Sequence, residues 1–423
     1  MPRCLAHGYI RKENHQQLPN KFQCQLNLVM PLELSLYSPT VFNQVLYPNN
    51  VQTKRIFKYI TIPILILFVL FWTGLILYQK YLQNKVKEKY RITTATAIDT
   101  LAKVNLGGID QWYLIRGCDR SSPILLYLHG GPGGPLFPRA RTIGTLTNLE
   151  KYFVMVYWEQ RGTGKSYHSS IPAETMDINQ FVLNARELTL FLQERFQVTK
   201  IYLLGISWGS MIGLLTAKQY PELFYAFIGV GQLVNPLEND RISYEFCLET
   251  AKKLEIEKAV NELERIGPPP YNYQKLIIQR KWLTRFEKVI LSEKGIQNYP
   301  EFNTVKKLLS TPEYSIVDIL RMGMDPYFSL KHLWNDEFYH TNLNESVPQI
   351  DIPVYFFMGR YDYITSADIV EKYVERLNAP KGKNLIWFEK SGHEPYFQEP
   401  EKFRDIMINI VLKETQFEST MNE

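Results

Sequence analysis

The pentapeptide Gly-Ile-Ser-Trp-Gly at positions 205–209 constrains the fold of this chain more than any other stretch. It follows an apolar run at 201–204 that has the character of a buried strand, and it precedes a run at 211–215 with the apolar content of a helix. A strand, a tight turn and a helix are the context in which Gly-x-Ser-x-Gly forms a nucleophile elbow, with the serine hydroxyl raised above the carboxyl end of a parallel sheet. Glycine on each side of the serine keeps Cβ atoms out of the bend. The alternative is a plain Gly/Ser turn between two buried elements, so the rest of the sequence must decide between the two.

Short and nearly continuous apolar runs recur along the chain, as is typical of strands covered on both faces. They occupy residues 123–128, 153–158, 201–204, 225–230, 354–358 and 385–388. Helical patterns, such as the one at 178–196, lie between several of these runs, and this alternation predicts an α/β fold with a mostly parallel sheet and helices on both faces. Residues 92–117 are predicted to add two strands joined by a turn at Gly107-Gly108.

The alternation of strands and helices stops between residues 232 and 348, where the sequence is charged, aromatic and helical. We predict helices at 240–266, 273–289 and 314–324. The simplest organisation is a helical cap at 232–348, inserted between a first core segment at 90–231 and a second at 349–415. Such a cap would roof the crevice at the carboxyl ends of the strands, where α/β proteins bind ligands.

Residues 59–78 form a run of twenty residues without a charge, long enough to cross the hydrocarbon core of a bilayer as a helix. We predict a single-pass transmembrane helix at 55–80, with the lipid bilayer as partner of residues 59–78; a buried core helix is the alternative. Residues 1–54, with scattered Pro, Asn and Gln, are predicted to be poorly ordered. Basic residues flank the span on both sides, so the side of the membrane that holds the remaining chain stays open. They are Lys54, Arg55 and Lys58 before it, and Lys80, Lys85, Lys87, Lys89 and Arg91 after it.

Two polar residues downstream of Ser207 complete a catalytic arrangement. Acyl transfer by serine needs a base to take its proton and an acid to hold that base in one tautomer, in the chain order Ser, acid, His. Asp362 and His393 each follow an apolar strand, so both are expected at the same rim of the sheet as the elbow. We assign Asp362 as the orienting acid and His393 as the general base. The alternatives left open are Glu389 or Asp325 as the acid and His129 as the base.

Backbone N–H groups are expected to stabilise the oxyanion that forms when serine attacks a carbonyl. One donor is the N–H of Trp208, directly after the serine, and the second comes from the loop that follows the third strand, here His-Gly-Gly-Pro-Gly-Gly at 129–134. Gly131 is our choice within that loop, with Gly130 as the alternative, because a glycine amide can turn toward the substrate without a Cβ in the way.

Three motifs together resemble those of the proline iminopeptidase (prolyl aminopeptidase) group of the α/β-hydrolases: HGGPG at 129–133, WEQRGTGKS at 158–166 and GISWGS at 205–210. The resemblance covers roughly residues 92–231 and 350–412. It implies an α/β-hydrolase fold with an inserted helical cap, a triad of Ser207, Asp362 and His393, and an oxyanion hole that includes the Trp208 N–H.

The resemblance also implies where a substrate's free amino group would bind. Enzymes of this group hold acidic residues in the cap for that purpose, and Glu238, Asp240 and Glu245 are the candidates here; a solvated helix face is the alternative. Two positions depart from the pattern. Glu159 stands where the group usually has Asp, and Tyr363 stands where some relatives have a second acid after the triad Asp.

These observations predict a membrane-anchored serine hydrolase that forms an acyl-enzyme at Ser207, most simply an aminopeptidase that releases the N-terminal residue of short peptides. An esterase or amidase acting on small or lipid-like acyl substrates is the nearest alternative. It would be favoured by a cap without an inward carboxylate that is lined by Trp282, Phe286, Phe328 and Trp334. A binding protein that keeps the hydrolase shell without turnover is the third.

The charge and the cysteine content of the chain bear on which partners and cofactors it would use. A net charge of +5 on 423 residues argues against a nucleic-acid surface. The four cysteines have no metal-ligand spacing, and the serine mechanism needs neither a metal nor a cofactor.

Overall fold

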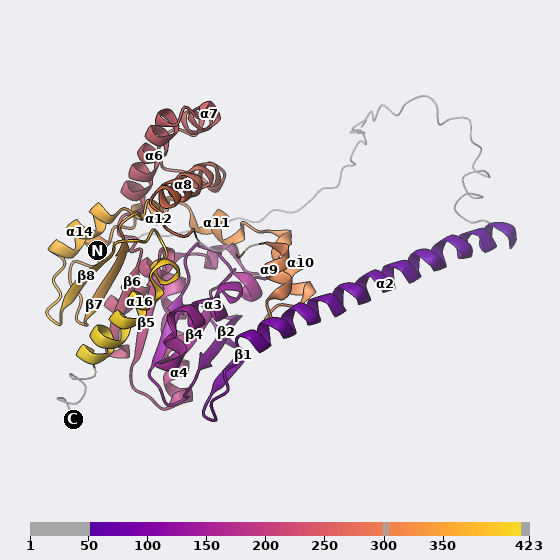
Figure 1. Ribbon diagram of the computed structural model, residues 1–423, viewed down its shortest axis with the longest axis horizontal. Coiled ribbons are helices and arrows are strands. Elements are labelled where there is room, and N and C mark those ends of the chain that lie inside the picture. The colour runs from indigo at the N-terminus through magenta and orange to yellow at the C-terminus, as the bar shows by residue number, and fades with distance from the viewer. Residues whose placement is uncertain (1–50, 299–301, 303, 416–423) are drawn as a thin grey trace, which may run out of the picture. The chain divides into compact units, whose positions relative to one another are not determined.

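A computed structural model describes residues 51–298, 302 and 304–415 (Figure 1). The chain divides into two units, residues 1–72 and residues 73–423. Residues 1–50 of the segment that we predicted to be poorly ordered, 1–54, lie outside the described residues. Residues 51–54 instead form the start of helix α2 (Val51–Lys89).

Helix α2 contains the stretch Phe57–Lys89, which is long and apolar enough to cross a membrane, and none of its most apolar window is buried. The helix extends beyond the predicted 55–80 because residues 79–89 contain neither Gly nor Pro and are rich in Lys and Gln, which are good helix formers. Its last turn carries Lys87 and Lys89, which favour the negative end of the helix dipole.

Eight strands form one sheet in the order β1-β2-β4-β3-β5-β6-β7-β8. The hairpin of β1 and β2 is antiparallel and β2 pairs antiparallel with β4, whereas all remaining pairs are parallel. Each predicted strand is present. Their bounds are β1 (Ile98–Leu106), β2 (Ile109–Gly117), β3 (Ile124–Leu128), β4 (Val154–Glu159), β5 (Ile201–Ile206), β6 (Phe224–Val230), β7 (Val354–Gly359) and β8 (Lys383–Phe388).

Helices cover both faces of the sheet, which explains why its central strands are apolar without alternation. In β3, Leu126 packs into the core on one face while Leu125 and Tyr127 pack into the core on the other. The first face carries α4 (Ile178–Phe196), α5 (Trp208–Gln219) and α14 (Ala367–Arg376). The second carries α3 (Phe137–Thr147), α15 (Pro395–Gln398), α16 (Pro400–Ile406) and the π-helix η5 (Met407–Leu412). The predicted mostly parallel α/β fold is confirmed.

The described residues between β6 and β7 contain only helices, and we refer to this insertion as the cap. A single helix expected at 240–266 is two helices, because Glu255 adopts a left-handed backbone (φ 52°) that ends the first. Side-chain caps fix several of the starts, for example Asn272 before α8 and the capping box of Ser315 and Asp318 at α10. The cap helices are α6 (Pro236–Lys253), α7 (Glu257–Ile266), α8 (Tyr273–Glu293), α9 (Val305–Ser310), α10 (Ile316–Met324), α11 (Phe328–Leu333), α12 (Asp336–His340) and α13 (Leu343–Ser346).

Short 3-10 turns complete the described elements. They are η1 (Leu149–Lys151), η2 (Gly164–Ser166), η3 (Ala173–Thr175) and η4 (Pro221–Leu223).

Candidate active site

Ser207 lies in the sharp turn between β5 and α5. Its backbone has φ 53° and ψ −122°, outside the regions that non-glycine residues favour, which costs on the order of 1–3 kcal/mol. A Cβ on Gly205 would lie 2.2 Å from the carbonyl oxygen of Gly209, and a Cβ on Gly209 would lie 2.3 Å from that of Leu128. The turn therefore requires both glycines of the motif, and the Ser207 N–H anchors it by donating to the Val230 carbonyl oxygen at 3.0 Å.

The residue after the serine, Trp208, opens helix α5 and is almost completely buried. Its N–H is among the first four of the helix, which have no carbonyl partner within the helix. The indole holds the turn in place because Nε1 donates to Oε1 of Gln160 at 3.2 Å, and Nε2 of Gln160 donates to the carbonyl oxygen of His129 at 3.0 Å. Gln160 thus connects the elbow with the glycine-rich loop.

Asp362 and His393 come together at the carboxyl ends of β7 and β8. Nδ1 of His393 lies 2.9 Å from Oδ2 of Asp362, and both side chains are buried. The carboxylate is oriented by three donors: the N–H groups of Ile364 and Thr365 to Oδ1, at 2.9 and 2.8 Å, and the Thr365 hydroxyl to Oδ2. The structure therefore brings the predicted acid and base into contact.

The two alternative acids have other partners. Glu389 pairs with Arg360 at an exposed site, with an N–O distance of 2.8 Å. Asp325 pairs with Lys331 at 2.7 Å.

Gly231, which the sequence analysis did not single out, makes room for the Asp362–His393 pair. It follows β6 and has φ 51°, and a Cβ there would lie 2.8 Å from Cε1 of His393 and 3.2 Å from Oδ2 of Asp362. The signal that could have identified it is a glycine directly after a predicted strand, at the rim where the polar residues gather.

The charge state of His393 depends on its burial and on three carboxylates. Burial disfavours the imidazolium, but the charge and hydrogen bond of Asp362, followed by the charges of Glu287 and Glu394, outweigh burial and raise the pKa of His393. The imidazole is thus surrounded by carboxylates that would stabilise the proton it takes from a serine.

His129 differs from His393 in the direction of its pKa shift and in its hydrogen bonds. Its Nε2 accepts the N–H of Gln160 at 3.1 Å, so Nδ1 carries the proton and donates to the carbonyl oxygen of Gly130 at 2.7 Å. Burial lowers the pKa of His129 to about 4. With both ring nitrogens engaged and the ring neutral, His129 holds the glycine-rich loop rather than moving protons.

The glycine-rich loop passes next to the serine. A Cβ on Gly130 would lie 3.2 Å from Cβ of Ser207, and Gly131 has φ 135°, a conformation that favours glycine. The end of the loop is fixed by the buried Glu159, which accepts the N–H groups of Leu136 and Phe137 at 3.1 and 3.2 Å.

Two cavities meet at Ser207. The smaller, about 460 Å³, is lined by Ser207, His393, Glu287, Glu394 and Arg139, and we refer to it as the acidic cavity. The larger, about 790 Å³, is also lined by Ser207 but otherwise mainly by apolar side chains and glycines, and we refer to it as the apolar cavity. Gly131 lines both.

Glu287 brings a carboxylate from the cap into the acidic cavity. It lies in α8, its side chain is fully buried, and Oε1 accepts the N–H of His393 at 3.3 Å. Glu394, the second carboxylate, pairs with Arg139 at 2.7 Å. The sequence analysis missed Glu287, although it stands four residues after Leu283 and four before Leu291 on the buried face of α8, where a charged residue is unusual.

The three acidic residues proposed from the sequence for amine binding lie elsewhere. Glu238 and Glu245 are exposed on α6, and both pair with Arg241, at 2.6 and 2.5 Å. Asp240 is buried, but Arg280 and the Tyr339 hydroxyl engage its oxygens at 2.6 and 2.8 Å. None of the three lines either cavity at Ser207.

The aromatic residues considered for an apolar cap are all buried, but among Trp282, Phe286, Phe328 and Trp334 only Trp334 lines a cavity at Ser207. Tyr363, at the position of a second acid in some relatives, stacks on Phe246 of the cap with ring centroids 4.0 Å apart.

Known proteins resemble this chain over most of the described core and cap. The family described as alpha/beta hydrolase fold matches residues 123–251. The probable aminopeptidase YbaC of Bacillus subtilis is 33% identical over 313 residues, which cover 74% of this chain and 96% of that protein. The proline iminopeptidase of Saccharolobus solfataricus is 24% identical over 314 residues, covering 72% and 89%. The crystal structure of the proline iminopeptidase of Mycobacterium smegmatis has the same fold, with a TM-score of 0.52 at 17% identity and coverage of 75% and 99%.

Proposed function

The chain belongs to the proline iminopeptidase group of the α/β-hydrolase family, and from this premise we propose that it is a membrane-anchored serine aminopeptidase. Ser207 is the nucleophile, His393 the general base and Asp362 the acid that orients the base. The observation that carries the proposal is the buried carboxylate of Glu287, which lines the same cavity as Ser207 and His393.

The reaction proceeds by acyl transfer. Oγ of Ser207 attacks the carbonyl carbon of the substrate's first residue while Nε2 of His393 takes the hydroxyl proton, and Asp362 holds Nδ1–H and stabilises the imidazolium. His393 then protonates the leaving amine, so the C–N bond breaks and an acyl-enzyme remains. Water, deprotonated by His393, attacks that ester and releases the amino acid.

Two backbone N–H groups stabilise the negative oxygen of the tetrahedral intermediate. They belong to Trp208, at the start of α5, and to Gly131, in the loop held by His129. One such donor contributes roughly 10²–10³ in rate.

Glu287 recognises the free amino group of the substrate. A positively charged amine next to the scissile carbonyl lies in the acidic cavity, where Glu287 accepts a charge-assisted hydrogen bond from it. Glu394 lines the same cavity and pairs with Arg139. Such a bond contributes roughly 1.5–3 kcal/mol, which is about 10- to 100-fold in affinity for the transition state.

The apolar part of α2 anchors the enzyme. Residues 59–78 are free of charge and the helix around them is long enough to span the hydrocarbon core of a bilayer, which supports a single-pass anchor.

The test compares substrates with and without a free amine, using the full-length protein in detergent or nanodiscs. A fluorophosphonate probe should label the wild type and fail to label Ser207→Ala. Alanyl and prolyl naphthylamides should be cleaved, and their N-acetylated forms should not. Glu287→Gln should lower kcat/KM for free-amine arylamides by about 10- to 100-fold, measured at a pH above the titration of His393.

Glu238→Gln is the matched control, because it removes an exposed carboxylate of the cap that pairs with Arg241. It should leave kcat/KM unchanged. Persistent labelling of Ser207→Ala would refute the nucleophile. Efficient cleavage of acyl nitrophenyl esters without arylamide turnover would refute the aminopeptidase.

An esterase or amidase acting on lipid-like acyl substrates is the second candidate, and the apolar cavity beside Ser207 favours it. In that case Glu287→Gln would have the same effect on substrates with and without an amine.

A further inference from the structure

Helix α10 of the cap exposes an apolar surface. Val317, Leu320 and Met324 share one side of the helix at spacings of three, four and seven residues, and they are 69%, 55% and 76% exposed. The charged residues of the helix are Asp318, which is buried, and Arg321, which pairs with it at 2.6 Å. A helix that is apolar toward the solvent as well as toward the core is unusual on a surface that faces only water.

The opposite side of α10 lines the apolar cavity. Ile319 and Met322 contribute to its wall, and Val305 of α9 and Tyr327, which also line it, are 69% and 43% exposed. The cavity therefore extends from Ser207 to a rim of exposed apolar side chains beside the α10 stripe.

The α10 surface lies close to the point where the apolar span ends. The apolar run ends at Tyr78, and Nε2 of the next residue, Gln79, donates to the carbonyl oxygen of Tyr314 at 3.1 Å. One turn further, Nε2 of Gln83 donates to the carbonyl oxygens of Tyr314 and Thr311, at 2.7 and 3.0 Å. The two carbonyl groups belong to the segment that leads directly into α10 (Figure 1). No spacer separates the end of the span from the cap.

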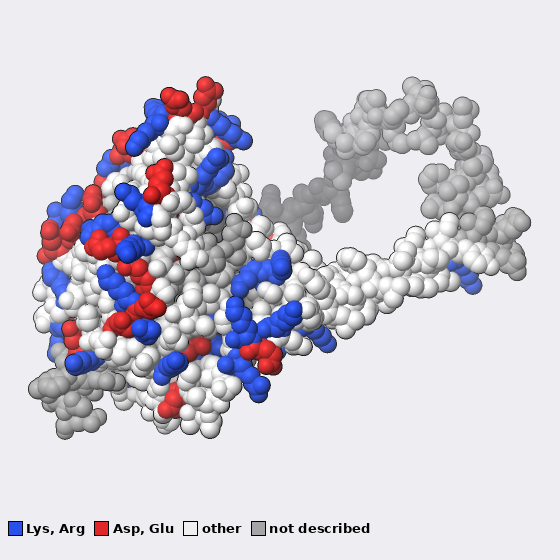
Figure 2. Space-filling model, in the orientation of Figure 1, with Lys and Arg blue, Asp and Glu red and all other residues white. Residues whose placement is uncertain are grey.

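The charge near this junction suits an anionic membrane surface. Residues 79–91 carry five basic and one acidic residue, and Lys306 and Lys307 of α9 lie nearby, so Lys and Arg side chains gather around α9 and the body end of α2 (Figure 2). Basic residues next to a span are attracted to anionic headgroups by about 1 kcal/mol each.

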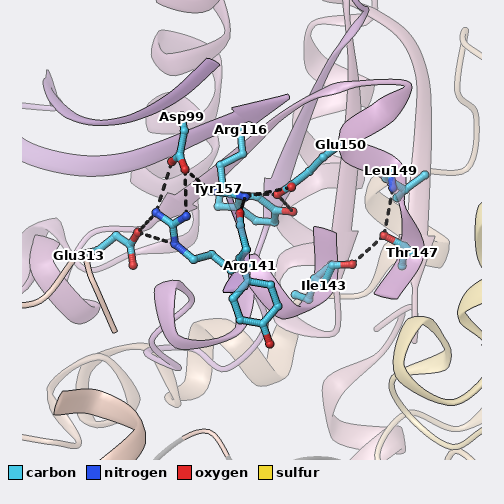
Figure 3. Close-up of polar contacts among 10 residues, drawn as sticks. Asp99, Arg116, Arg141, Ile143, Thr147, Leu149, Glu150, Tyr157 and Glu313 are labelled. Atoms are coloured by element: carbon cyan, nitrogen blue, oxygen red, sulfur yellow. Dashed lines mark hydrogen bonds and ion pairs between the residues drawn. The ribbon is translucent and has the colours of Figure 1, made fainter. Parts of the chain in front are cut away.

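An ion-pair network fixes the junction, and all its members except Asp99 are buried (Figure 3). Glu313, beside Tyr314, accepts from Arg141 of α3 at 2.7 Å, and Arg141 also donates to Asp99 of β1 at 2.9 Å. Arg116 of β2 pairs with the same Asp99 and donates to the carbonyl oxygen of Tyr90, just after α2, at 2.8 Å. The segment before α10 and the end of α2 are thus tied to the same core strands.

We propose that the apolar stripe of α10, with Val305 and Tyr327, rests in the lipid headgroup–acyl boundary of the membrane, and that substrates with an apolar part reach Ser207 from the bilayer through the apolar cavity. The occupant of this surface is lipid, because the segment that leads into α10 is hydrogen-bonded to Gln79 and Gln83, directly after the apolar run and within its basic flank. The inference rests on the membrane anchor of the proposed function, and it adds the substrate class: amphiphiles, such as hydrophobic or lipid-linked peptides, whose apolar part partitions into the membrane.

The first test measures whether α10 contacts lipid. An environment-sensitive fluorophore is attached to Val317→Cys, Leu320→Cys or Met324→Cys in full-length protein in which Cys4, Cys24 and Cys118 are replaced by Ser. The protein is reconstituted into vesicles of phosphatidylcholine and phosphatidylglycerol, with or without lipids that carry a nitroxide near the headgroup. Emission should shift to the blue and be quenched by the nitroxide lipids. The control is Leu254→Cys, an exposed apolar position between α6 and α7, which should show neither effect.

Two results would overturn the docking. Emission typical of water at all three positions would mean that the stripe faces solvent. A blue shift without quenching by nitroxide lipids would mean that protein, for example a second copy of the chain, covers it.

The second test measures access from the bilayer. A long-chain fluorophosphonate dissolved in the vesicle membrane should label Ser207 about tenfold more slowly in Leu320→Asp/Met324→Asp than in wild type. The double variant loses two apolar side chains that would insert into lipid, which should weaken docking to the membrane by at least that factor. A short water-soluble fluorophosphonate should label both proteins at the same rate, which also shows that the variant is folded. Membrane access would be refuted if the double variant slowed labelling by both probes equally, or if it slowed labelling by neither probe. Failure of the soluble probe on wild type would instead refute the proposed serine enzyme.

Discussion

Replacing Gly231 by Ala tests the geometry of the proposed base. An added Cβ would lie 2.8 Å from Cε1 and 2.9 Å from Nδ1 of His393, whereas ordinary contacts begin near 3.4 Å, so the ring must move by about 0.6 Å or more. The positive φ of residue 231 adds roughly 1–2 kcal/mol of strain for alanine. A displacement approaching 1 Å in a catalytic group costs on the order of 10²-fold in rate.

Gly267→Ala is the matched control, because Gly267 has a similar φ of 67° but no atom within 4 Å of an added Cβ. We expect both variants to lose about 1–2 kcal/mol of unfolding free energy, measured by urea denaturation. Only Gly231→Ala should also lose about 10²-fold in kcat/KM for alanyl naphthylamide. If Gly231→Ala is folded and has the same kcat/KM as Gly267→Ala, displacement of the His393 ring does not affect catalysis. His393 would then not be the general base.

Three further perturbations have expected outcomes. Glu287→Gln removes a charge that raises the pKa of His393, so the acid limb of the kcat/KM–pH profile should move to lower pH. His129 has a pKa of about 4 in the folded chain but of about 6.5 in the unfolded chain. Because only the unfolded chain takes up this proton between pH 6.5 and 4, the unfolding free energy should fall by up to about 3 kcal/mol over that range. His129→Gln should make the unfolding free energy depend less on pH there. Arg141→Met leaves the buried carboxylate of Glu313 without its partner and should cost about 3–5 kcal/mol by urea denaturation, and Arg141→Met/Glu313→Leu should recover most of it.

The sheet was predictable from the sequence because burial on two faces leaves a strong local signal. In β4 all six residues are buried, and the five that precede Glu159 form an uninterrupted apolar run. The elbow was predictable for a different reason: backbone atoms lie so close to Gly205 and Gly209 that neither position can carry a Cβ, and the two glycines are therefore visible in the sequence as a motif. Loops at the carboxyl ends of β7 and β8 then pointed to Asp362 and His393, which the structure places 2.9 Å apart.

The carboxylate that we propose for amine binding was not predictable in the same way, because the orientation of cap helices is set by tertiary packing. Glu238 and Glu245 lie three to four residues from Arg241, and their local pairing keeps them on the solvent side of α6. Glu287 has apolar neighbours on its face of α8, and only the docking of that face over the sheet brings it to His393. The C-terminal part of α2 also makes contacts outside the local sequence, those of Gln79 and Gln83 with the cap.

The two cavities at Ser207 impose a direction on the substrate. Glu287, Glu394 and His393 line the acidic cavity, so an ammonium group would be stabilised there by the carboxylates. In the apolar cavity the same group would lose its hydration at a cost in free energy. An aminopeptidase cleaves the bond that follows the residue bearing the amine, so the leaving group must extend away from Glu287. The apolar cavity is the space at Ser207 that remains for it, and its rim is formed by the exposed side chains of Val305 and Tyr327. The proposed substrate would therefore place its amine-bearing first residue in one cavity and an apolar remainder in the other, with Ser207 lining both, which agrees with the proposed uptake of substrates from a membrane surface.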